Sequence, residues 1–182
     1  SGNDTVEVRG GGVSPYDSST EMWPLTFLNA STTLTCSGGA TIGQVSPTGN
    51  NLINLSTSST VSGCNFSNVS LKTAYSGGVP SPGIRVVGNT FSSSATGTIE
   101  FVYGASDFEI SNNTNINYLS LGATSTQGLI QGNTFYGRLA MPDNVAMFST
   151  SASSSELRVL SNTFTSYIPS TFSTSRLVVI DG

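Results

Sequence analysis

The chain has few charged residues and no histidine. Of its 182 residues, 9% are charged and only one is a lysine, whereas a typical soluble domain has about 25% charged residues. Without histidine there is no imidazole for general base catalysis, for a Ser-His-Asp triad or for an ordinary transition-metal site. The net charge of −4 and the lack of clustered Lys and Arg argue against nucleic acid as a partner.

Long apolar runs and helical periodicity are also missing. No apolar run approaches the ~18 residues that a membrane-spanning helix needs, and no long segment repeats apolar residues at 3.6-residue spacing. Nine Phe, six Tyr and many β-branched residues still supply surface to bury, which disordered chains usually lack. The composition favours one domain, 1–182, of short strands joined by polar turns.

Cysteine is scarce as well. Cys36 and Cys64 are too few to define a disulfide scaffold. Two thiols in the core are the simpler interpretation, and a single disulfide is the alternative. The acidic residues are too scattered for a dense Ca²⁺ loop, so we expect no metal and no cofactor.

The chain does contain a short sequence motif that repeats, called here the Asn-Thr phrase. An alternating apolar strand is followed by Asn-Thr and, in most copies, by Phe. The copies are Ile84–Phe91, Phe108–Thr114, Ile130–Phe135 and Leu157–Phe164, with a degenerate copy at Val61–Phe66. From Cys64, the first Asn equivalent, the steps along the copies are 25, 24, 20 and 29 residues. Repeats of about 20–50 residues indicate a stacked architecture.

The Asn of each copy is expected to lie at a tight bend. Asn tolerates left-handed backbone angles and bonds to nearby backbone through its side chain. If the bend recurs once per coil, the amides stack on one another and the Phe rings fill the interior corner. The predicted Asn ladder consists of Asn89, Asn113, Asn133 and Asn162.

Each coil also contains a second apolar strand. Candidates are 98–104, 116–122, 138–141 and 176–180, and the N-terminal part has similar short strands at 5–8, 25–28, 32–36 and 51–55. We therefore predict an all-β parallel β-solenoid of roughly seven coils of about 20–29 residues over 31–182. Residues 1–30 form an irregular lid or junction that includes Pro15, Tyr16, Trp23 and Pro24. An antiparallel sandwich or jelly roll is the alternative fold, but its strands have no reason to share a turn phrase.

The pattern apolar-x-apolar-x-Gly/Ser-Asn-Thr-Phe, over about residues 61–179, resembles the right-handed parallel β-helix of the pectin-lyase-like superfamily. That superfamily includes polysaccharide lyases, glycoside hydrolases, epimerases, adhesins and bacteriophage tailspikes or tail fibres. The low charge, the abundance of Ser, Thr, Asn and Gly, and the absence of a recognisable cap are most similar to a fragment of a tailspike or tail fibre. The resemblance implies a homotrimer, in a virion or otherwise extracellular, that contacts bacterial surface polysaccharide; a surface adhesin is a further possibility.

A polysaccharide-degrading enzyme on the same scaffold is the alternative function. Glycoside hydrolysis needs two carboxylates on one surface, and the densest acidic region contains Glu100, Asp107 and Glu109. A simpler interpretation is a surface ion pair between Glu109 and Arg85 one coil away, worth about 0–1 kcal/mol. We therefore favour binding without catalysis for this segment.

Tyrosines are the candidate sugar-binding residues. Tyr103, Tyr118 and Tyr136 lie in the strand-rich region, and a Tyr ring combines an apolar face with a polar tip. The same rings could instead pack between coils or at a subunit interface.

Overall fold

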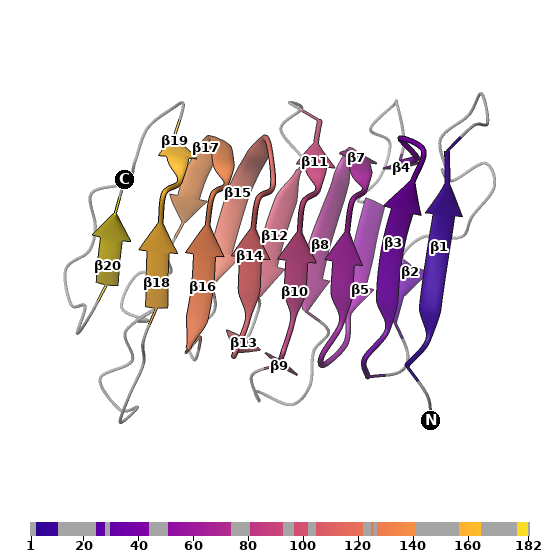
Figure 1. Cartoon of the computed structure of the whole chain (residues 1–182), viewed down its shortest axis with the longest axis horizontal. Helices are drawn as coiled ribbons and strands as arrows, with labels where there is room; N and C mark the ends of the chain where they lie inside the picture. Colours follow the sequence, from indigo (N-terminus) through magenta and orange to yellow (C-terminus); the bar gives the residue numbers. More distant parts are fainter. Residues whose placement is uncertain are drawn as a thin grey trace.

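The computed structural model describes residues 3–10, 25–27, 30–43, 51–73, 81–92, 97–101, 105–121, 125, 127–140, 157–164 and 178–181. In these residues the chain is a parallel β-solenoid, as the repeat predicts, and every regular element is a strand (Figure 1). The described residues support about 4 turns of this solenoid. Within this part of the chain no helix is long and apolar enough to cross a membrane.

The first sheet is the longest and holds eight strands in parallel register. Its order follows the sequence, one strand from each successive coil. The strands are β1 (Thr5–Arg9), β3 (Thr33–Ser37), β6 (Thr60–Ser62), β10 (Arg85–Val87), β14 (Glu109–Ser111), β16 (Gly128–Gln131), β18 (Leu157–Leu160) and β20 (Val178–Asp181).

The second sheet has seven strands and closes the opposite side of the coil. Its strands are β2 (Leu25–Thr26), β5 (Asn51–Leu55), β8 (Val69–Thr73), β12 (Thr98–Phe101), β15 (Ile116–Leu121), β17 (Thr134–Ala140) and β19 (Thr163–Phe164). A three-stranded sheet links the two, with β4 (Thr41–Gly43), β7 (Asn65–Ser67) and β11 (Thr90–Phe91). The short pair β9 (Ser81–Pro82) and β13 (Ala105–Ser106) lies before the first sheet.

The winding is visible in Figure 1. The strands of the first sheet rise at the front, the chain passes over the top, and the fainter second sheet descends behind while the coils advance from the N-terminus on the right to the C-terminus on the left. This sense of rotation and advance is right-handed, the hand that parallel crossover connections almost always take. Because every described pair of neighbouring strands is parallel, the alternative prediction of an antiparallel sandwich is wrong.

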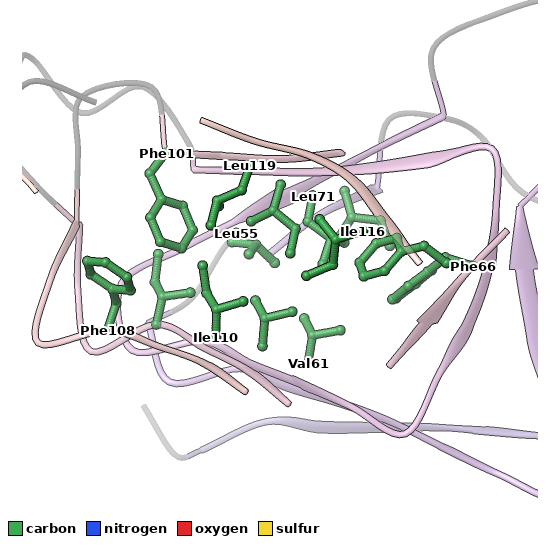
Figure 2. Close-up of a cluster of buried hydrophobic side chains, with 14 of the residues drawn as sticks. Leu55, Val61, Phe66, Leu71, Phe101, Phe108, Ile110, Ile116 and Leu119 are labelled. Carbon is green, nitrogen blue, oxygen red and sulfur yellow. The ribbon is translucent and has the colours of Figure 1, made fainter. Parts of the chain in front are cut away.

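Alternation along each strand sends one set of side chains into the coil. In the first sheet Val61, Val86, Ile110 and Ile130 occupy one register column and are fully buried. Figure 2 shows side chains of the two long sheets meeting in the interior, with Phe101 and Phe108 at one end and Phe66 at the other. The burial confirms the predicted corner role of Phe66, Phe91 and Phe135; the Phe164 side chain lies outside the described set.

The Asn ladder is confirmed in detail. Asn113 is fully buried, and its Oδ1 accepts two hydrogen bonds, from the backbone N–H of Asn89 at 2.9 Å and from Asn89 Nδ2 at 3.0 Å. Its Nδ2 donates to the carbonyl of Val86 in the preceding coil at 2.8 Å and to Asn133 Oδ1 at 2.9 Å. Asn133 repeats this pattern with Asn162. Each interior amide therefore fills the hydrogen-bonding capacity that a buried amide must satisfy.

The residue before each ladder position has a left-handed backbone. The φ values are 68° at Gly63, 66° at Gly88, 54° at Asn112, 63° at Gly132 and 50° at Ser161. Gly adopts this region freely and Asn tolerates it, whereas other L-residues are strained there. The requirement explains why the repeat has Gly, Asn or Ser immediately before the ladder position.

The two cysteines form a disulfide, so the simpler interpretation of two core thiols is wrong and the alternative is confirmed. Cys36 of β3 is bonded to Cys64, with the two Cα atoms 4.8 Å apart. Cys64 occupies the Asn position of its coil, and its backbone N–H donates to Asn89 Oδ1 at 3.0 Å. The ladder thus ends at Cys64, and a covalent bond makes the next link towards the N-terminus.

One strand assignment from the sequence is wrong. Residues 176–180 were expected to provide a second strand of the coil, but β20 pairs with β18 in the first sheet, with Ile180 opposite Val159. A short apolar strand without a following Asn-Thr phrase carries no information about which side of the coil it occupies. At the other end, β1 lies within the segment 1–30 and pairs with β3; Pro15, Tyr16, Trp23 and Pro24 lie outside the described residues.

Candidate functional site

An open groove crosses the outer surface of the first sheet. Its volume is about 520 Å³. Its lining comes from four consecutive strands, β10, β14, β16 and β18, and from the residues just before them. These strands stand side by side on the front face in Figure 1. The lining residues are Arg85, Asp107, Phe108, Glu109, Gln127, Gly128, Leu129 and Arg158.

At one end of the groove, Arg85 contacts the carboxylates of Asp107 and Glu109. Register places it opposite Glu109 in the next coil, as the sequence predicts, and its Nε lies 3.7 Å from Glu109 Oε2. Its Nη2 lies 3.3 Å from Asp107 Oδ1, and its Nη1 donates to the backbone carbonyl of Asp107. Glu109 also accepts a hydrogen bond from Ser111 Oγ at 2.5 Å. One guanidinium therefore orients both carboxylates of the groove.

Phe108, Gly128 and Leu129 make the apolar floor. Phe108 is buried and meets Phe101 edge-on, with ring centroids 5.2 Å apart. Its ring passes over Gly128, where an added Cβ would lie 2.1 Å from Phe108 Cζ. Any larger residue at 128 would displace the ring, so this glycine lets the aromatic side chain extend beneath the groove. Leu129 is half-buried and adds apolar surface beside it.

Gln127 and Arg158 complete the groove, and sequence reasoning did not select Gln127. Both are exposed. No hydrogen bond or ion pair joins either side chain to another residue within the described ranges. Arg158 lies next to Leu129 in the register of the sheet. The formal charges of Arg85 and Arg158 cancel those of Asp107 and Glu109, which leaves a polar groove without net charge.

The structure brings together two of the three predicted carboxylates. Asp107 and Glu109 both contact Arg85. Glu100 lies in β12 of the second sheet and pairs with Lys72 of the neighbouring coil at 3.3 Å. It does not line the groove. Outward alternation was correct for Glu100 and Glu109, but the two strands belong to different sides of the coil.

The predicted tyrosines give no further site. Tyr103 lies outside the described residues. Tyr118 and Tyr136 lie in β15 and β17, but their side chains are not among those described. Their proposed contact with sugar stays a prediction.

Elsewhere on the surface the charged groups pair locally. Near the N-terminus, Arg9 Nη2 lies 2.7 Å from Glu7 Oε2, and Ser37 Oγ donates to the same carboxylate. Hydrogen bonds from Arg9 and Ser37 lower the pKa of Glu7, and that carboxylate raises the pKa of Arg9. Among residues whose placement is described, no three His, Cys, Asp or Glu side chains gather as a metal ion would require.

Comparison with protein-family models, with curated proteins and with solved structures finds no match for this chain.

Proposed function

We propose that this chain is a polysaccharide-binding β-solenoid, the receptor-contacting segment of a phage tail fibre or tailspike. The observation that supports it best is the groove across β10, β14, β16 and β18. Strands about 4.8 Å apart make such a groove about 14 Å long, enough for a short oligosaccharide. The resemblance of the repeat to the pectin-lyase-like superfamily adds to this proposal without deciding the ligand.

The chemistry of the groove suits a neutral, hydroxyl-rich ligand. Guanidinium and amide N–H groups donate, and carboxylate and amide oxygens accept, so both kinds of partner are available to a sugar hydroxyl. Leu129, half-buried beside the buried Phe108, offers apolar surface to the C–H face of a sugar ring. Because the charges within the groove balance, strong attraction of a polyanion is not expected.

A binding experiment tests the proposal. Purified bacterial O-polysaccharide and capsular polysaccharide preparations are titrated against the unaltered chain, an Arg158→Ala variant and a Lys72→Ala variant. Arg158 lies in the groove and Lys72 on the opposite sheet. We expect Arg158→Ala to weaken binding about tenfold, the loss of one charged hydrogen bond, and Lys72→Ala to leave it unchanged. Equal effects of the two substitutions, or no binding to any preparation, would contradict the proposal.

Glycoside hydrolysis is a second candidate, favoured by the two carboxylates that share Arg85. Their common contact keeps them within about 10 Å, which overlaps the roughly 5–9.5 Å separations of glycosidase pairs. Both carboxylates already contact the Arg85 guanidinium, so binding is the better-supported function. Release of reducing ends, abolished in Asp107→Asn or Glu109→Gln and kept in Glu7→Gln, would instead establish hydrolysis.

A surface adhesin is favoured by a separate observation, the disulfide between Cys36 and Cys64. Disulfides form and persist in oxidising compartments and are rare in the cytosol, where a virion protein folds. Sedimentation distinguishes the two settings: an intact homotrimer supports the fibre, and a monomer supports the adhesin.

A further inference from the structure

A column of left-handed residues leads into the first sheet. Each member lies two positions before one of the register partners Thr33, Thr60, Arg85, Glu109 and Leu129. The column therefore repeats once per coil at the same corner. Its members are Ser31 (φ 62°), Ser58 (φ 57°), Gly83 (φ 72°), Asp107 (φ 49°) and Gln127 (φ 52°).

The corner explains a left-handed residue at this position in every coil, but it does not explain the long side chain of Gln127. Gly83 has no Cβ to strain, and Asp107 has a short polar side chain of the kind that tolerates this region. Asp107 also pairs with Arg85. Gln127 has a long exposed side chain with no hydrogen bond or ion pair to any residue in the described part of the chain. A non-Gly residue held there without local compensation destabilises the fold.

Strained backbone positions cluster at ligand-binding sites, and Gln127 lies in the groove beside Asp107 and Leu129. Its amide offers two donors and one acceptor oxygen, which match two neighbouring hydroxyls of a sugar ring. Building on the proposed function, we infer that Gln127 is a ligand-contacting residue for neutral polysaccharide, kept at the expense of stability. Gly at this position would relax the backbone and remove the contact.

The test is a Gln127→Gly substitution in the full chain. The probe is the O-polysaccharide or capsular preparation that the unaltered chain binds most tightly. We expect the unfolding midpoint to rise by about 2–4 °C, as relief of a left-handed non-Gly residue should produce. We expect affinity to fall about tenfold, as for loss of a paired polar contact. Stability and binding should therefore change in opposite directions.

Two further variants separate conformation from contact. Ser58→Gly relaxes the same column outside the groove, so it should raise the midpoint without changing affinity. Gln127→Ala keeps a Cβ in the left-handed region and removes the amide, so it should lose affinity without the gain in midpoint. A chain that binds no preparation overturns the proposed function. A chain that binds, with unchanged affinity in Gln127→Gly and Gln127→Ala, overturns this inference alone.

Discussion

Two stretches of one corner join neighbouring coils by different chemistry. From Asn89 to Asn133 the link is a run of buried amides, each bonded to the coils before and after it, and the run ends at the half-buried Asn162. Between Cys36 and Cys64 the link is a disulfide. The amide run satisfies backbone groups that the bend would otherwise bury unpaired, whereas the disulfide mainly restricts the unfolded chain.

The difference shows what the corner requires. Cys64 cannot donate as an amide does, but its own backbone N–H still bonds to Asn89 Oδ1. At position 64 the corner therefore has no side-chain amide, and a covalent bond to Cys36 joins this position to the preceding coil. The two stretches should respond differently to substitution, to reducing agent and to relief of backbone strain.

The largest effect should come from the middle of the amide run. Asn113→Ala removes four hydrogen bonds and leaves the backbone N–H of Asn89 and the carbonyl of Val86 without their partner. Each buried group left unpaired costs about 1–3 kcal/mol, so we expect a loss of about 3–5 kcal/mol in the free energy of unfolding. Denaturant titration measures it.

A matched control for that substitution is Asn54→Ala. The Asn54 side chain donates to Thr26 Oγ1 at 3.1 Å on the outer face of the second sheet. An exposed hydrogen bond of this kind should cost under about 1 kcal/mol. Equal losses for Asn113 and Asn54 would mean that the ladder adds nothing beyond ordinary surface bonding.

The disulfide should give the next largest effect. Replacing both cysteines by alanine should lower the free energy of unfolding by about 2–4 kcal/mol. The reason is that the loop between Cys36 and Cys64, which are 28 positions apart in the sequence, is no longer closed by a covalent bond. Reducing agent should destabilise the unaltered chain and leave the double alanine variant unchanged. If reducing agent shifted both proteins equally, or neither, the disulfide would not be the N-terminal link of the corner.

The smallest effects are expected from the left-handed residues that precede the ladder Asn positions. Ser161 precedes Asn162 with φ 50°, so Ser161→Gly should stabilise the chain by about 0.4–1 kcal/mol. Gly88→Ala should do the opposite, by about 1–2 kcal/mol, although an added Cβ there has nothing within 4 Å. Thermal unfolding measures both. A destabilised Ser161→Gly would show that the serine side chain matters more than its backbone angle.

The sequence was sufficient for the parts of the fold that repeat. The spacing of the ladder Asn residues gave the register between Arg85 and Glu109, because a parallel stack places equivalent positions one above another. The sequence was insufficient to predict the sheet to which β20 belongs, because β20 lacks the Asn-Thr phrase. It was also insufficient to predict the disulfide, since residue types alone do not reveal whether two thiols meet. Both depend on three-dimensional placement.

The candidate site was predicted only in part. Asp107 and Glu109 stood out as acidic residues, and Glu100 was grouped with them although it lies in the second strand of its coil, which belongs to the opposite sheet. Gln127 carries no motif, and its distinguishing property is a backbone angle that appears only in the structure. A sequence signal existed nonetheless: aligned on the repeat, residue 127 stands two positions before Leu129 where an earlier coil has Gly83.

Hydrogen exchange of the Asn side-chain amides, followed by NMR, tests the stacked corner most directly. The Nδ2 protons of Asn89, Asn113 and Asn133 are buried and doubly hydrogen-bonded, so they should exchange far more slowly than those of the exposed neighbour Asn112. Exchange of all four amides at the same rate would contradict the ladder and, with it, the coil alignment that positions the groove.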